Sequence, residues 1–164
     1  MTLILIVGAL SSTYVGARCG RDQVFSEIAD LHVATLASPS PVDAISTNRH
    51  TVKPWFQGKI PFAFNLPDLK NSEYSLLGGR MTYLEQMPGA HLIYDVRKHH
   101  ISVFVFQERS LRAKLYENSL SPKNLSFDVE TWSQGGLRYF AIGDANAADI
   151  DNLAELFKTS ESQI

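Results

Sequence analysis

The chain has a single cysteine, Cys19, among its 164 residues. One thiol cannot build an internal disulfide framework, and it cannot supply the ligands of a cysteine-rich zinc site. Cys19 lies just after an uncharged N-terminal stretch, so we interpret it as a bystander beside a membrane rather than as a redox centre. The sequence therefore argues against disulfide-stabilised scaffolds and cysteine-rich zinc domains.

The chain also lacks an excess of positive charge. Seventeen acidic residues stand against fifteen basic ones, which gives a formal net charge of −2. Proteins that bind DNA or RNA draw much of their affinity from basic side chains that neutralise phosphates. We therefore expect no nucleic-acid partner.

No nucleophile elbow, phosphate-binding glycine loop or metalloprotease helix is present. Gly78-Gly79-Arg80 lies inside a strand pattern, which favours a β-bulge or a close backbone contact, with Trp55 packed against it. His99 and His100, with His91 on the neighbouring strand, are the one candidate metal set, but adjacent strand residues point to opposite faces. We assign no catalytic, cofactor-binding or metal-binding residues, no cofactor and no enzymatic activity.

The first 17 residues carry no charged side chain and end in Val15-Gly16-Ala17. We expect residues 1–20 to form a short transmembrane or signal-anchor segment. Two alternatives stay open: the outer part of a longer membrane helix, and a signal peptide cleaved after Ala17. Arg18 and Arg21 by themselves place the following residues in the cytoplasm. The family resemblance given below implies the opposite side, and we follow the resemblance.

Residues 21–38 predict a membrane-proximal amphipathic helix, because Val24, Ile28, Leu31 and His32 recur at helical spacing up to about residue 36. Prolines at positions 39 and 41 end this helix. We predict that residues 39–164 form one α+β domain, which the family resemblance given below places on the extracytoplasmic side. With 45% hydrophobic residues, the chain is long enough for one core.

The residue pattern of this domain predicts an antiparallel sheet of about five strands. The strands are expected at 74–85, 90–98, 101–106, 125–132 and 137–142, with a candidate edge strand at 42–45. Gln86-Met87-Pro88-Gly89 predicts a type II turn, and Gln134-Gly135-Gly136 predicts the turn of a second hairpin. Residues 108–123 predict a long loop. Residues 60–67, which contain two prolines, predict an extended segment that covers the sheet or binds a partner.

Two helices are expected to pack on one face of this sheet. The first runs through residues 50–56, is capped by Ser46, Thr47 or Asn48, and stops at Gly58. The second follows Asn146, which together with Asp149 approximates a capping box. Its apolar stripe is Ile150, Leu153, Ala154 and Phe157.

Three blocks form a recognition signature rather than a catalytic one. They are His-Thr-Val-Lys-Pro-Trp-Phe at 50–56 with Gln-Gly-Lys-Ile at 57–60, Leu-Leu-Gly-Gly-Arg-Met-Thr-Tyr-Leu at 76–84, and the block from Trp132 to Asp144. In this order, over about residues 21–158, the chain resembles the extracytoplasmic domain of bacterial transmembrane anti-sigma factors. The signature residues that we expect to serve structure or interaction are His50, Lys53, Pro54, Trp55, Phe56, Gly78, Gly79, Trp132, Gly135 and Gly136.

The resemblance implies a membrane-anchored domain on the periplasmic side that takes part in signal transduction and transcription regulation. Family members carry a cytosolic zinc-binding domain with a His-x3-Cys-x2-Cys motif, which this sequence lacks, so a sigma factor is an expected partner only if such a domain lies upstream. We expect protein partners in or outside the membrane. The alternative hypothesis is an accessory structural subunit of a membrane protein complex.

Overall fold

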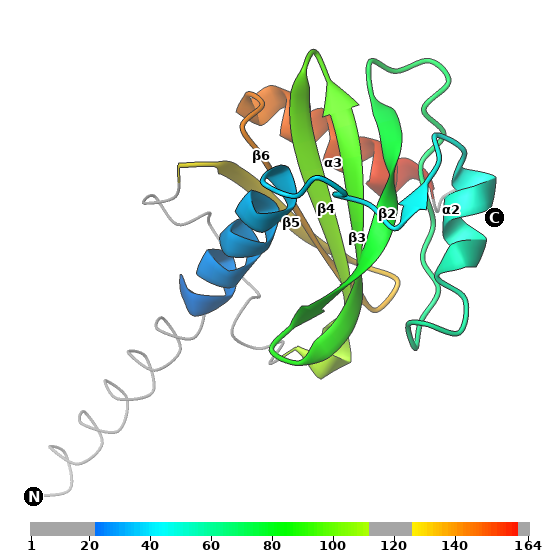
Figure 1. Cartoon of the computed structure of the whole chain (residues 1–164), viewed down its shortest axis with the longest axis vertical. Helices are drawn as coiled ribbons and strands as arrows, with labels where there is room; N and C mark the ends of the chain where they lie inside the picture. The colour runs from blue at the N-terminus through cyan, green and yellow to red at the C-terminus, as the bar shows by residue number, and fades with distance from the viewer. Residues whose placement is uncertain (1–21, 112–125, 161–164) are drawn as a thin grey trace, which may run out of the picture.

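The computed structural model describes residues 22–111 and 126–160, which form one six-stranded antiparallel sheet with helices on both faces (Figure 1). The predicted α+β class and antiparallel sheet are confirmed. The sheet has six strands rather than about five because the candidate edge strand does pair, with Ala44 opposite Gly79 and Ile45 opposite Gly78.

The strands follow the order β1-β2-β3-β4-β6-β5 across the sheet. Their bounds are β1 Ala44–Ile45, β2 Ser75–Leu84, β3 Met87–Val96, β4 His99–Gln107, β5 Asp128–Gln134 and β6 Leu137–Gly143. In β4, the six consecutive residues from Ile101 to Phe106 are all buried. This continuous buried run, apolar except for Ser102, is typical of a strand that is covered on both sides.

The first two hairpins turn at different residues from those expected. Leu84 pairs directly with Met87, and Val96 pairs with His99, so the turns are Glu85-Gln86 and Arg97-Lys98. All four turn residues have positive φ, as two-residue loops need in order to match the twist of the strands. The predicted type II turn is therefore wrong, and Pro88 and Gly89 continue strand β3.

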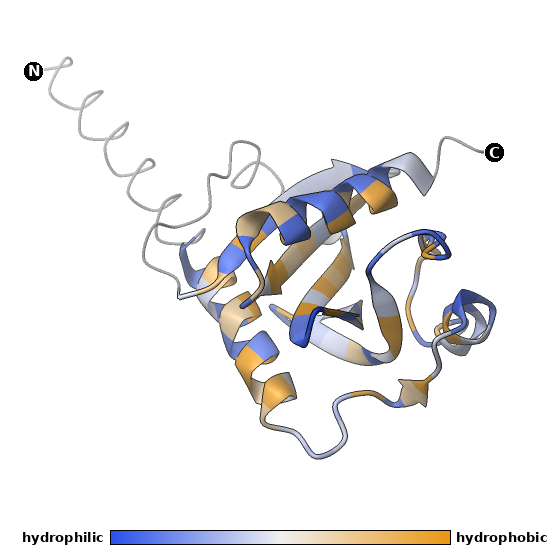
Figure 2. Ribbon diagram, turned by 90° about the horizontal axis from the view of Figure 1, so that it is seen from above, coloured by the Kyte–Doolittle hydropathy of each residue, from blue (hydrophilic) through white to orange (hydrophobic). Residues whose placement is uncertain are grey.

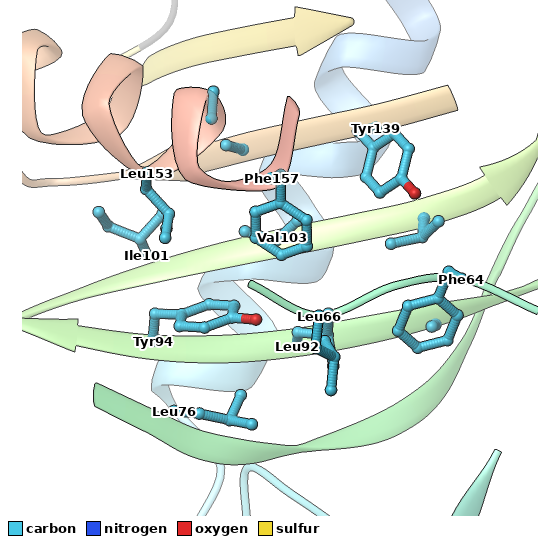
Figure 3. Packing of buried hydrophobic residues seen from close by; sticks show 14 of the residues in the cluster. Phe64, Leu66, Leu76, Leu92, Tyr94, Ile101, Val103, Tyr139, Leu153 and Phe157 are labelled. Carbon is cyan, nitrogen blue, oxygen red and sulfur yellow. The ribbon is translucent and has the colours of Figure 1, made fainter. Parts of the chain in front are cut away.

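One face of the sheet is covered by α2 (Arg49–Trp55), α3 (Ala147–Ser160) and the extended segment 60–66. Figure 3 shows Leu153 and Phe157 of α3 beside Ile101 and Val103 of β4, with Leu66 further along the sheet. Segment 60–67 thus covers the sheet, which confirms the first of the two interpretations made from its sequence.

The opposite face is covered by a helix that occupies residues 22–36. Its Val24, Phe25 and Ile28 pack against Phe104 and Phe106 of β4 and against side chains of β6. Figure 2 shows the sheet lying between this helix and α3. The expectation that helices cover only one face is wrong, because the alternate side chains of β4 are apolar on both sides and both faces need a cover.

No helix within residues 22–111 and 126–160 is long and apolar enough to cross a membrane. The predicted membrane stretch Met1–Ala17 and Cys19 lie outside the described residues. Of the predicted loop 108–123, the structure describes a 3-10 turn, η1 (Glu108–Ser110), and Leu111.

Candidate functional site

The first signature block forms α2, as predicted. Asn48 caps the helix, with its side-chain oxygen accepting a hydrogen bond of 2.8 Å from the backbone N–H of His50. Pro54 lies in the last turn, and Gly58 follows with a φ of +75°. This conformation suits glycine, so the chain turns away from the helix there.

Phe56, rather than Trp55, packs against the glycines of the second block. A Cβ on Gly79 would come within 2.9 Å of the Phe56 ring, so the glycine leaves room for it. A bulge interrupts the β2–β3 register between Leu76 and Gly78, as predicted. At Gly78 the backbone oxygen of Ala44 approaches so closely that any Cβ would collide with it.

Trp55 is half-buried at the surface of α2, which corrects the expectation that it is the residue packed on Gly78 and Gly79. The ammonium group of Lys59 lies 4.1 Å from the centre of the Trp55 ring and donates a hydrogen bond of 2.8 Å to the Trp55 carbonyl oxygen. The tryptophan thus offers part of its ring, covered by a cation, to the surface.

Two adjoining hollows lie along α2 and share Arg49, His50 and Leu66 in their walls; we call them together the α2 cleft. The smaller has a volume of about 310 Å³ and the larger of about 430 Å³. The cleft is lined by residues 47–50, 53, 54, 57, 65–70, 74–76, 94 and 160. Signature residues His50, Lys53 and Pro54 therefore lie in the wall of one concave site.

The smaller hollow carries positive charge. Arg49 and Lys53 line it, and none of the described residues that line it is acidic. Lys53 donates a hydrogen bond of 2.7 Å to the uncharged side chain of Asn65, and no acidic side chain among the described residues pairs with it. Arg49 lies 3.6 Å from Asp68 at a rim where both side chains are partly exposed. This hollow favours an anionic ligand.

The floor of the larger hollow is apolar, with Leu66, Leu76 and Tyr94 in its lining. Tyr94 is fully buried, and its hydroxyl has no hydrogen-bond partner among the described residues. Figure 3 shows this hydroxyl pointing along the sheet towards Leu66 and Leu92. Burial raises the pKa of Tyr94 above its ordinary value, so the hydroxyl stays a donor.

The third signature block lies at the other edge of the sheet, on β5 and β6, away from α2. Trp132 stacks on Tyr139 with 5.0 Å between ring centres and also contacts Phe157 of α3. Gly135 and Gly136 form the predicted hairpin turn, with φ values of +59° and +74°. Trp132 thus packs between the sheet and α3, and none of the residues of this block lies in the α2 cleft.

The candidate metal histidines do not converge. His99 pairs with Asp144 at 3.3 Å and His100 with Asp95 at 2.5 Å, whereas His91 is buried. Within the described part of the chain, no three histidine, cysteine or acidic residues are placed to hold a metal ion.

His91 instead belongs to a buried polar line that the sequence analysis missed. His32 Nδ1 and His91 Nε2 each lie 2.8 Å from the Ser102 hydroxyl oxygen. Burial lowers the pKa of His32 to about 4 and that of His91 to about 3. One indication of this line is present in the sequence, because His32 lies on the apolar stripe of the helix that occupies residues 22–36. Its partners Ser102 and His91 lie far along the chain, so the sequence pattern does not identify them.

We found no match to the chain among protein-family models, curated proteins or solved structures.

Proposed function

We propose that the chain is a membrane-anchored, extracytoplasmic sensory and interaction domain, similar to the outer part of an anti-sigma factor, which acts by binding rather than by catalysis. The observation that carries this proposal is that two elements lie on opposite faces of one sheet. The α2 cleft opens on one face, and the helix of residues 22–36 packs on the other.

The central strand β4 contacts the elements on both faces. Val103 and Val105 belong to the core beneath α2 and α3, while Phe104 and Phe106 lie beneath the helix of residues 22–36. In the sequence, that helix follows the uncharged stretch of residues 1–17. A ligand in the α2 cleft is therefore separated from the membrane-directed helix by a single layer of strands, which is the arrangement that a sensory domain needs.

The ligand side of the proposal is tested with an acidic probe. A hexaglutamate peptide is titrated into the detergent-solubilised full chain, with hexalysine as the charge-reversed comparison. We expect hexaglutamate alone to bind, and Lys53→Glu to weaken it about tenfold or more, because repulsion replaces attraction in the smaller hollow. Lys59→Glu, which alters a lysine outside the cleft, is the matched control.

Absence of hexaglutamate binding would reject an acidic ligand for the cleft. Equal losses in the two variants would show that binding follows overall charge and not the cleft.

The membrane side is tested separately. The full chain should stay in the membrane fraction after carbonate washing, and a chain starting at Arg21 should be soluble. Protease added outside intact spheroplasts should digest the domain. Protection of the domain from that protease would place it in the cytoplasm, as the charge of Arg18 and Arg21 suggests.

A further inference from the structure

Three buried polar side chains from three different elements form a continuous line. His32 comes from the helix of residues 22–36, Ser102 from β4 and His91 from β3. None is more than 1% exposed. Ser102 stands in the middle, with one imidazole nitrogen of each histidine 2.8 Å from its oxygen.

The surroundings of this line are apolar. The His91 ring stacks on Phe104 with 4.1 Å between ring centres, and the Phe127 ring meets His32 edge-on at 5.0 Å. The helix packs on this face mainly through Val24, Phe25 and Ile28. A buried polar contact therefore lies inside an otherwise hydrophobic interface between helix and sheet.

Both hydrogen bonds of the line can form only when at least one of the two histidines is neutral. The Ser102 hydroxyl donates one hydrogen bond and accepts another, so one facing imidazole nitrogen accepts and the other donates. His32 Nε2 has no partner among the described residues. A buried nitrogen lone pair without a hydrogen-bond partner destabilises the fold less than a buried N–H without one. We therefore assign two hydrogen bonds: His32 Nδ1–H donates to the Ser102 oxygen, and the Ser102 O–H donates to His91 Nε2.

Protonation of either histidine leaves an N–H donor without an acceptor. With a proton on His91 Nε2, the Ser102 hydroxyl donates to His32 Nδ1 and the hydrogen of His32 moves to Nε2; a proton added to His32 also lies on Nε2, where the described residues offer no acceptor. Either event also places a positive charge in an apolar interface. Hydration of the charged histidine relieves both penalties, and water can reach the histidines only if the helix moves off the sheet.

The charges around the line do not compensate for its burial. Asp144, after β6, raises the pKa of His32, while His100 of β4 lowers it. His32 itself and Arg80 of β2 lower the pKa of His91. Burial is the largest influence on both histidines, so each stays neutral near pH 7.

We propose that the His32–Ser102–His91 line is an acid-sensitive latch, and that protonation of His32, the histidine on the helix, releases the helix of residues 22–36 from the sheet. The core beneath α2 and α3 lies on the opposite face and contains none of the three latch residues. Release therefore changes the element next to the membrane-directed segment while the rest of the fold persists. Acidification outside the membrane is a second input, independent of the α2 cleft.

Amide hydrogen exchange of the full chain in detergent, at pH 7 and pH 5, tests the latch. After correction for intrinsic exchange rates, we expect the protection of residues 24–35 to fall about 30-fold between pH 7 and pH 5. The reason is that a histidine exposed to water when the helix is released, with its ordinary pKa, binds a proton at pH 5 that the buried histidine does not bind. At pH 5 the protection of residues 150–157 in α3 should remain higher than that of residues 24–35, because release of the helix leaves α3 on the sheet. Equal protection of the two helices at pH 5, which unfolding of the whole domain would give, would overturn the proposal.

His32→Gln is the decisive variant, because the amide keeps hydrogen-bonding groups but does not titrate. In this variant we expect the loss of protection of residues 24–35 between pH 7 and pH 5 to shrink to less than a third of the wild-type loss. The matched control is the double variant His99→Gln, His100→Gln, which removes two exposed histidines and should keep the full effect. An unchanged loss in His32→Gln would overturn the latch.

Side-chain NMR titration of the wild-type chain gives a check that needs no variant. While the helix is protected, the rings of His32 and His91 should remain neutral down to pH 5. A histidine that titrates above pH 6 with the helix still docked would also overturn the proposal.

Discussion

The Phe56 ring in α2 lies on the bare backbone of Gly79 in β2, and a Cβ at Gly79 would come within 2.9 Å of the ring. The same Cβ would lie 3.2 Å from the backbone oxygen of His91 on the neighbouring strand. Phe56 is 2% exposed and belongs to the core between α2 and the sheet. This contact joins the first two signature blocks and fixes the position of the α2 cleft.

Gly79→Ala should therefore destabilise the fold. We expect a loss of about 1–3 kcal/mol in the free energy of unfolding, because the added methyl group must displace a buried ring or a strand. Urea unfolding followed by tryptophan fluorescence measures it. Ser75→Ala, at an exposed position of the same strand, should change stability by less than about 0.5 kcal/mol.

Phe56→Ala should cost more than Trp55→Ala. Truncating a fully buried phenylalanine loses about 3–5 kcal/mol. Trp55 is half-buried and gains its cation–π contact with Lys59 at the surface, so its truncation should cost about 1–2 kcal/mol. Equal losses in unfolding free energy would show that Trp55 is as important to the core as Phe56.

The sequence predicted elements well where the deciding contacts are local. Asn48 caps α2 through the N–H two residues on, and Gly135-Gly136 turns the second hairpin through its own backbone angles. The prediction from the sequence failed where two neighbouring segments could each form the turn. Pro88-Gly89 is a strong turn signal, yet the pairing of Leu84 with Met87 shifts the turn to Glu85-Gln86. That pairing puts Gly89 against the Phe106 ring, where any Cβ would collide.

Contacts between distant residues were beyond the sequence pattern. Periodicity placed His32 on the apolar stripe of its helix, but it does not say that Ser102, 70 residues away, supplies the partner. Trp55 and Phe56 are neighbours of similar hydrophobicity, and only the approach angle of α2 decides which ring meets Gly79. The α2 cleft likewise arises from the segment 65–70 lying beside the helix.

Asn146→Ala should weaken the start of α3. The Asn146 side chain accepts a hydrogen bond of 2.9 Å from the Asp149 backbone N–H and donates one of 2.7 Å to the Asp149 carboxylate. Loss of a helix cap costs about 0.5–2 kcal/mol, measurable by urea unfolding. Asn152→Ala, at an exposed position within the same helix, is the control and should not destabilise the protein.

Chelators should leave thermal stability unchanged, because His99 and His100 each pair with a different carboxylate rather than with a shared ion. The measurement is a melting curve with chelator and another with added zinc or copper. A metal-dependent rise in melting temperature that disappears in the His99→Ala, His100→Ala variant would contradict this prediction and indicate a metal sensor at the start of β4.

Global stability should fall as the pH decreases from 7 to 5. Burial lowers the pKa of His32 to about 4 and that of His91 to about 3, both below the ordinary value of 6.5. Between those values and 6.5, the unfolded chain binds protons that the folded chain does not, so acid favours unfolding. We expect the free energy of unfolding at pH 5 to be lower by roughly 2–4 kcal/mol, measured by urea denaturation.

The histidines responsible are separated by substitution. A His32→Gln, His91→Gln variant should lose less than half as much stability between pH 7 and pH 5 as the wild type, because the titrating pair is gone. A His99→Gln, His100→Gln variant should keep the wild-type loss, since both side chains are nearly half-exposed. If the second variant abolishes the pH dependence and the first does not, the exposed hairpin histidines and not the buried line control the acid response.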